Sequence, residues 1–152
     1  MTENAAPYAS RRGIAGWLMF DWAAQPFYTL ITTFVFAPFF ASALAKDAAD
    51  GQALWGYATG FAGLCIALLS PLLGGIADRT GPRKPWIAAF GALLVIGSAM
   101  LWFAVPGSAT AVPIALAGFV IATVGAEFAT TFNNAMMTRL VPPERLGWLS
   151  GT

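Results

Sequence analysis

The sequence has no histidine and a single cysteine, Cys65, among its 152 residues. Without histidine the chain cannot build a His-ligated zinc site, a Ser-His-Asp triad or a histidine proton relay. One cysteine cannot form a disulfide within the chain, and Cys65 lies in an apolar run where a thiol acts as a small packing group. Any proton chemistry therefore has to use carboxylates.

Charged residues are also scarce. They make up 10% of the chain, against about 25% in soluble domains, whereas 58% of the residues are hydrophobic. A water-soluble chain of this length could not bury so much apolar surface, so we predict an integral membrane protein whose first partner is the lipid bilayer. The net charge of +1 and the lack of a basic run exclude nucleic acid as an expected partner. No nucleophile–base pair, metal-ligand cluster or phosphate loop stands in the sequence, so we expect no enzyme, no metal and no cofactor.

Runs without charge locate the membrane-spanning segments. They cover residues 22–45, 51–77 and 85–126, and the last is long enough for two spans joined by a turn at 105–110. A crossing helix needs about 20 apolar residues, and a spanning segment must be helical to pair its backbone groups. The sequence therefore predicts an all-α membrane protein with four transmembrane helices, at about 14–40, 54–77, 86–104 and 112–137.

The positions of lysine and arginine predict the orientation. Seven of the eight fall in the tail 1–13, between the second and third spans, or in the segment 138–152: Arg11, Arg12, Arg79, Arg83, Lys84, Arg139 and Arg145. Only Lys46 lies on the other side. By the positive-inside rule, we expect residues 1–13 to be a cytoplasmic tail and residues 138–152 a cytoplasmic loop.

The first span has an alternative interpretation as a cleavable export signal, because a pair of arginines precedes its apolar run. That run, however, is about twice as long as the 7–15 residues of a signal core. It also contains Asp21, Gln25 and Pro26. These features favour a membrane span.

Polar side chains recur along one face of the first and fourth predicted helices. The first helix carries Asp21, Gln25, Tyr28 and Thr32, and the fourth carries Thr123, Glu127, Thr130 or Thr131, and Asn134. At 3.6 residues per turn, each set forms one polar stripe on an otherwise apolar helix. Pro26 removes a backbone hydrogen bond beside the first stripe, where we expect a bend.

The two acids in these stripes, Asp21 and Glu127, suggest a solute path. An acid near the bilayer centre costs about 2.5–3.5 kcal/mol on insertion scales, so it rarely faces lipid, and neither span contains a basic residue to pair with it. We interpret the stripes as the lining of a water-filled path in which Glu127 carries a proton. The alternative is a set of interhelical hydrogen bonds of about 0.6 kcal/mol each, which we favour for Thr130 and Thr131 taken alone.

The second and third predicted helices carry no such stripe. Gly56, Gly60 and Gly63 lie near one face of the second, and the Gly56-xxx-Gly60 spacing predicts close packing against another helix. The third has only Ser98 as a polar residue in its core, so we expect it at the periphery, facing lipid.

The loop between these two helices, residues 74–86, reads GGIADRTGPRKPW. Gly81 suits a tight turn. Asp78 ends the second helix, where the helix dipole disfavours an acid, so we expect it to pair with an arginine or with the N-terminus of another helix. The plain alternative is a basic turn that contacts anionic lipid.

This loop resembles the signature of the major facilitator superfamily, roughly G-x-L-A-D-R-x-G-R-K, with Pro82 in place of a basic residue. The matching positions are Gly74, Asp78, Arg79, Gly81, Arg83 and Lys84. Residues 20–27, 81–86, 125–128, 132–136 and 146–151 further resemble the autophagy-related vacuole-effluxer-like branch of that superfamily. Asn133 and Trp148 depart from the branch pattern.

The resemblance implies a secondary active transporter with twelve helices in two halves of inverted three-helix repeats, of which this chain holds the first four. It implies that the first and fourth helices lie beside the central cavity. It also implies that Asp78, with Arg79 and Arg83 as neighbours, helps to latch the outward-facing state. A bacterial inner membrane, a small solute such as an amino acid, and protons are the implied setting and partners, and sodium coupling stays open.

The chain stops at Thr152, where the family begins its fifth helix, so we expect a fragment whose further partner is the missing remainder of the transporter. Two other classes stay open. One is a complete four-span exporter that acts as an oligomer, and the other is a membrane assembly subunit that transports nothing.

Overall fold

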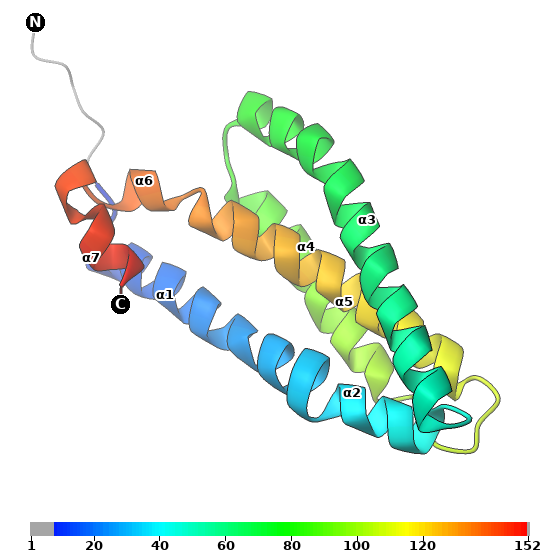
Figure 1. Ribbon diagram of the computed structural model, residues 1–152. Helices are drawn as coiled ribbons and strands as arrows, with labels where there is room; N and C mark the ends of the chain where they lie inside the picture. Colours follow the sequence, from blue (N-terminus) through cyan, green and yellow to red (C-terminus); the bar gives the residue numbers. More distant parts are fainter. Residues whose placement is uncertain (1–7, 152) are drawn as a thin grey trace, which may run out of the picture.

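The computed structural model describes residues 8–151, and this part of the chain is helical throughout, with no strand (Figure 1). Its elements are α1 (Arg11–Pro26), the π-helix η1 (Phe27–Phe34), α2 (Phe36–Phe39), the π-helix η2 (Phe40–Leu44), α3 (Ala48–Thr80), α4 (Lys84–Leu101), α5 (Ala111–Asn134), α6 (Met137–Leu140), the 3-10 helix η3 (Pro143–Arg145) and α7 (Leu146–Ser150). Four helical runs are long and apolar enough to cross a membrane: Arg11–Leu44, Ala48–Thr80, Lys84–Leu101 and Ala111–Leu140. The prediction of an all-helical chain with four membrane-length helices is confirmed.

The ends of α3 lie beyond the span of 54–77 that its charge-free run indicates. Asp47 caps the N-terminus by accepting a hydrogen bond from the Asp50 backbone N–H at 2.8 Å, so the helix begins among charged residues. At the other end the helix continues to Thr80 and stops at Gly81, whose φ of 80° is the left-handed conformation expected of a tight turn. Charge marks where the hydrocarbon ends, whereas capping decides where the helix ends.

The first crossing is interrupted rather than continuous. The α-helix passes into π geometry directly after Pro26, where we expected a bend, and the helix breaks at Val35 (φ −117°, ψ −61°). Pro38 accounts for the break, because it has no N–H to donate to the Phe34 carbonyl and its ring crowds that group. Figure 1 shows the ribbon opening between η1 and α2.

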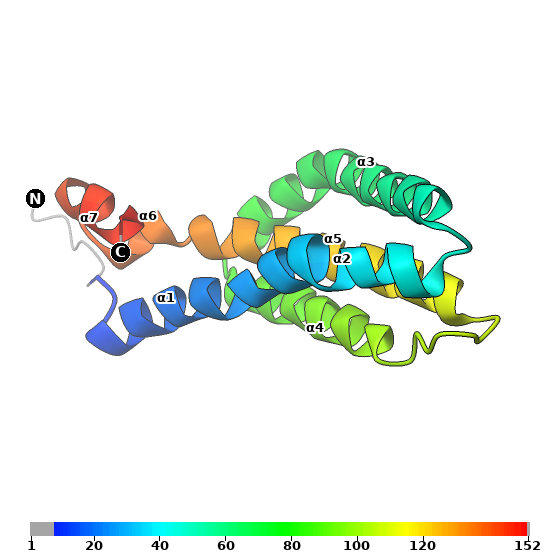
Figure 2. The same cartoon turned by 60° about the horizontal axis from the view of Figure 1, so that its bottom comes forward.

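Helix α5 is the centre of the bundle. It packs against α1, α3 and α4 and holds more buried residues than any other helix (Figures 1 and 2). Its closest partner is α4, because Gly97 of α4 meets Gly118 and Ala122 of α5, and Gly125 of α5 meets the backbone of Phe90 and Leu94. A Cβ atom added to Gly97 would lie 2.4 Å from the Ala122 backbone nitrogen. The outer side of α4 is exposed, as expected for a peripheral helix.

The predicted packing motif on α3 is wrong for the described part of the chain. Cβ atoms added to Gly56, Gly60 or Gly63 would meet nothing within 4 Å, and all three glycines are exposed. Instead, α3 packs on α5 through aromatic rings, with the Trp55 and Phe119 ring centroids 4.0 Å apart.

The two ends of the described part of the chain and the α3–α4 turn lie at the same end of the bundle (Figure 1). The segment after α5, which we predicted as a loop, forms the short helices α6, η3 and α7 up to residue 151. These fold back so that Leu140, Val141 and Leu149 cover Trp17 of α1. Of the predicted tail 1–13, residues 1–7 lie outside the described part of the chain, and α1 begins at Arg11 with Ser10 as its cap.

The contact between α4 and α5 yields a stability prediction. Replacing glycine by alanine favours a helix by about 1 kcal/mol when nothing else changes, whereas overpacking costs about 1–3 kcal/mol. We therefore expect Gly97→Ala to lower the denaturant midpoint of unfolding in detergent, and Gly56→Ala, the matched control on α3, to raise it or leave it unchanged. Equal midpoints for the two variants would contradict the described packing.

Candidate functional site

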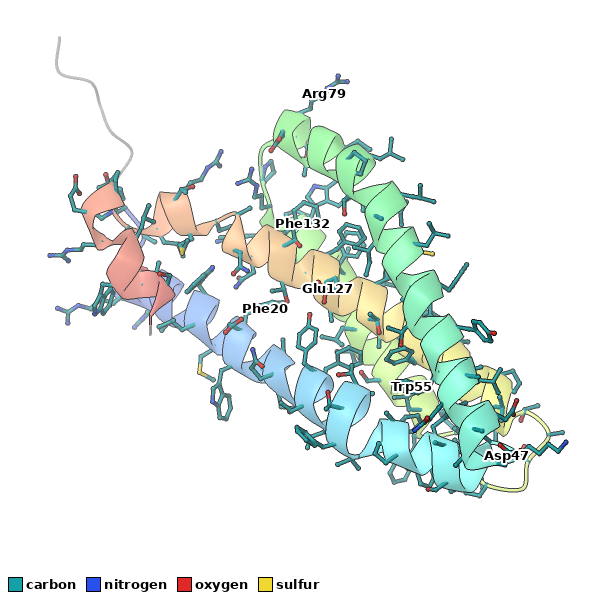
Figure 3. The ribbon with its side chains drawn as sticks, viewed as in Figure 1. Phe20, Asp47, Trp55, Arg79, Glu127 and Phe132 are labelled. Atoms are coloured by element: carbon teal, nitrogen blue, oxygen red, sulfur yellow. The ribbon has the colours of Figure 1, made fainter. Side chains whose placement is uncertain are left out.

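Tyr28 is the member of the first polar stripe that lies against α5. Phe27 is buried against Ala122 and Ala126 of α5, and this contact places Tyr28 beside the second stripe. The Tyr28 side chain lies near those of Glu127 and Thr130. Figure 3 shows Glu127 on the side of α5 that faces α1. The two stripes thus meet at Tyr28.

The polar side chains near Tyr28 differ in how exposed they are. Glu127 is half-buried, and the Thr130 hydroxyl oxygen is buried without a hydrogen bond to any described residue. A buried hydroxyl in this state can still donate to or accept from a solute or a water molecule. Asp21 and Gln25 are exposed and line a hollow on α1 together with Trp22. Asp21 lies two turns nearer the charged end of the bundle than Tyr28.

Two hydroxyl groups of the stripes form hydrogen bonds within their own helices. Thr32 donates to the Tyr28 carbonyl oxygen, and Thr123 donates to the Phe119 carbonyl oxygen at 2.8 Å. Such bonds satisfy a hydroxyl in an apolar medium without a partner from another helix. Thr131 and Asn134, which we predicted in the second stripe, are exposed on the surface of the described chain. The structure therefore brings together Tyr28, Glu127 and Thr130, with Asp21 nearby.

Asn133 is the polar residue that the stripe pattern missed. It is buried, accepts a 2.7 Å hydrogen bond from the Trp17 indole N–H through its backbone oxygen, and donates from Nδ2 to the Trp17 carbonyl at 3.4 Å. This reciprocal pair ties α1 to α5 at the charged end of the bundle. Asn133 lies three residues after Thr130, and Asn134 lies four residues after it. The predicted stripe took the four-residue step, so it included Asn134 and missed Asn133.

The α3–α4 turn is held by Arg83. Its Nη2 lies 2.9 Å from Oδ1 of Asp78, and its Nη1 donates to the Ala135 carbonyl at 2.7 Å. Asp78 thus has the arginine partner that its place at a helix C-terminus calls for. The Arg83 side chain is 20% exposed and that of Asp78 is 71% exposed, so the acid keeps most of its surface open. By capping the end of α5, Arg83 fixes the turn to the central helix.

The remaining residues of the loop motif lie apart from this contact. Arg79 projects from the tip of α3 (Figure 3). Lys84 begins α4, and an added Cβ at Gly74 would meet nothing within 4 Å. No group of three His, Cys, Asp or Glu side chains within residues 8–151 is placed to hold a metal ion.

Two comparisons with known proteins found a match. The sequence profile described as Major Facilitator Superfamily matches residues 5–152. The chain is also 31% identical over 137 residues to a protein of Bacillus subtilis (strain 168) described as "Uncharacterized MFS-type transporter YxiO". That alignment covers 88% of this chain and 31% of the relative, so the chain spans about a third of the relative's length. No solved structure matches the chain.

The two bonds of Arg83 are expected to differ in strength. An exposed ion pair contributes about 0–1 kcal/mol, whereas a hydrogen bond from a charged donor to a partly buried carbonyl contributes about 1.5–3 kcal/mol. Arg83→Gln should therefore lower the denaturant midpoint in detergent clearly more than Asp78→Asn, which leaves the bond to Ala135 in place. A larger loss in Asp78→Asn would show that the ion pair, and not the cap on α5, holds the turn.

Proposed function

Because the chain belongs to the major facilitator superfamily, we propose that it forms part of a secondary active transporter that moves a small solute across the membrane by alternating access. The proposal for the path rests on one observation. Tyr28, Glu127 and Thr130 lie close together between η1 and α5, and Asp21 lies two turns away on the exposed side of α1. A path between these helices leads from Asp21, near the charged end, to Glu127 deeper in the membrane.

Glu127 is the residue that couples transport to protons in this proposal. It lies between buried Ala126 and Phe128 on an apolar helix, and no described lysine or arginine pairs with it. An acid within an apolar span rarely faces lipid, and carboxylates in such positions form proton relays in transporters. It therefore takes up a proton from one side of the membrane and releases it when water reaches it from the other.

The charged end of the bundle faces the cytoplasm in this proposal. The seven lysines and arginines at that end agree with the positive-inside rule. There the reciprocal bonds of Trp17 and Asn133 hold α1 against α5 on the cytoplasmic side of Asp21 and Glu127. Asp78, bound to Arg83 but 71% exposed, keeps a face for the second half of the transporter. This exposure supports its proposed role in latching the outward-facing state.

The solute in this proposal is small and resembles an amino acid. The motif resemblance to the autophagy-related vacuole-effluxer-like branch supports a small amino-acid-like solute, and a bacterial inner membrane as the setting. The path offers carboxylates, a phenol and hydroxyls, which suit a solute with an amino group. The further helices of a twelve-helix transporter would supply the rest of the binding site.

Proton-driven transport by reconstituted protein tests this function. We expect protein of the full length that its gene encodes, in vesicles with an imposed pH gradient, to accumulate a member of an amino-acid and peptide panel. Glu127→Gln keeps the size of the side chain but cannot exchange a proton. It should reduce proton-driven accumulation to the level of protein-free vesicles while leaving exchange of solute across the membrane.

Glu144→Gln is the matched control, because Glu144 is an exposed acid in η3, outside the membrane-spanning helices. It should transport as the unaltered protein does. Unchanged proton dependence in Glu127→Gln would refute the role of Glu127. Transport by a homo-oligomer of only this chain would instead support a four-span exporter, and no transport of any solute would favour an assembly subunit.

A further inference from the structure

A second polar hollow lies on the opposite side of α1 from the Asp21 hollow, at the charged end of the bundle. It is formed where α1, α4 and the segment after α5 meet, and Arg12, Lys84 and Arg139 each contribute to its lining from a different helix. Asn133 also lines it. No acidic residue does. The lining of this hollow therefore carries three positive charges and no negative charge.

These cations are not neutralised by the protein. The pair of Arg83 and Asp78 is the one ion pair found within residues 8–151, so Arg12, Lys84 and Arg139 lack a carboxylate partner there. All three side chains are exposed. Cations that converge at the membrane surface repel one another, and an anion between them removes the repulsion.

A separate apolar groove lies farther along the same helices. It is lined by Ala23 of α1, by Phe27 and Leu30 of η1, and by Leu94, Val95 and Ser98 of α4. On the first crossing Gly13, Gly16 and Phe20 of the hollow lead toward Ala23 of the groove in steps of three or four residues, which keeps them on one helix face. Because α1 and α4 run in the same direction, the cationic hollow and the apolar groove lie in line along both helices.

The depth of the groove matches one leaflet of a bilayer. Lys84 and Ser98, the first and last lining residues on α4, are separated by about 21 Å at 1.5 Å per residue, which is about half of the roughly 40–45 Å thickness of a bilayer with its headgroups. A small residue in the lining leaves room beside it, since a Cβ atom added to Gly16 would meet nothing within 4 Å.

We propose that this groove binds an anionic phospholipid of the cytoplasmic leaflet, with its phosphate between Arg12, Lys84 and Arg139 and an acyl chain between α1 and α4. A free phosphate would satisfy the cations but not the apolar groove, and a neutral lipid would satisfy the groove but not the cations. Only a molecule with both parts matches the whole site. The site lies apart from the path between η1 and α5 and does not depend on the transport proposal.

Lipid retention measured by native mass spectrometry tests this site. The protein, in the full length that its gene encodes, is titrated in neutral detergent with phosphatidylglycerol or phosphatidylcholine. We expect one phosphatidylglycerol to bind more tightly than phosphatidylcholine. The double variant Arg12→Gln/Arg139→Gln should weaken it roughly thirtyfold, since each cation near an anionic surface contributes about a factor of five.

The matched control is Arg11→Gln/Arg145→Gln, which removes the same charge from the same end of the bundle but outside the lining of the hollow. It should retain phosphatidylglycerol as the unaltered protein does. Ala88→Phe, which fills the hollow without changing its charge, should lose the lipid as well, and Arg12→Lys/Arg139→Lys should keep it.

Four results would overturn the proposal. Equal retention of the two lipids would remove the role of the phosphate, and an equal loss in both double variants would reduce the effect to net charge. Full competition by inorganic phosphate would make the hollow a site for free anions. The absence of any retained lipid would mean that another segment or protein fills the groove.

Discussion

Hydrocarbon offers no hydrogen bonds, so each polar group within the membrane has to find its partner in the protein, and this constraint orders the polar contacts of the chain. Thr32 and Thr123 donate to carbonyl groups of their own helices. The Asn133 amide and the Trp17 indole satisfy each other's backbones across α1 and α5. Glu127, Tyr28 and the Thr130 hydroxyl lie together between η1 and α5, and the exposed Asp21 and Gln25 lie nearer the charged end. Polar side chains gathered in this way within the membrane support the proposed solute path.

Helix α5 connects this path to the rest of the bundle. Its glycines admit α4 closely on one side, while Glu127 and Thr130 face the first crossing on the other. At its C-terminal end, it receives the Arg83 cap. A movement of α5 would therefore displace residues of the proposed path and of the α3–α4 turn together. Arg83 contacts both Asp78 and the C-terminal end of α5. The loop motif is therefore linked through α5 to Glu127 and Thr130.

The sequence predicted the spans, the arginine partner of Asp78 and the turn at Gly81, because each depends on local chemistry: charge-free length, a helix dipole, and a positive φ. It could not predict which glycines pack. Gly56, Gly60 and Gly97 all lie in apolar helices, so the sequence alone does not indicate which of them contacts another helix. In the tertiary structure it is Gly97 that contacts α5. Asn133 was missed for a related reason, since steps of three and four residues are both helical and lead to different faces. The π-helical turns after Pro26 carry no pattern that distinguishes them from an α-helix.

Water access to the two acids tests the central claim most directly. In a Cys65→Ala background, which removes the one native thiol, Asp21→Cys and Glu127→Cys can be exposed to a membrane-impermeant thiol reagent. Val95→Cys, in the apolar groove beside α4, serves as the reference. A shared hydrated path predicts that both former acid positions react from the same side of the membrane, Asp21→Cys the faster, while Val95→Cys stays unlabelled. If Glu127→Cys reacts no faster than Val95→Cys from either side, there is no water-filled route between η1 and α5.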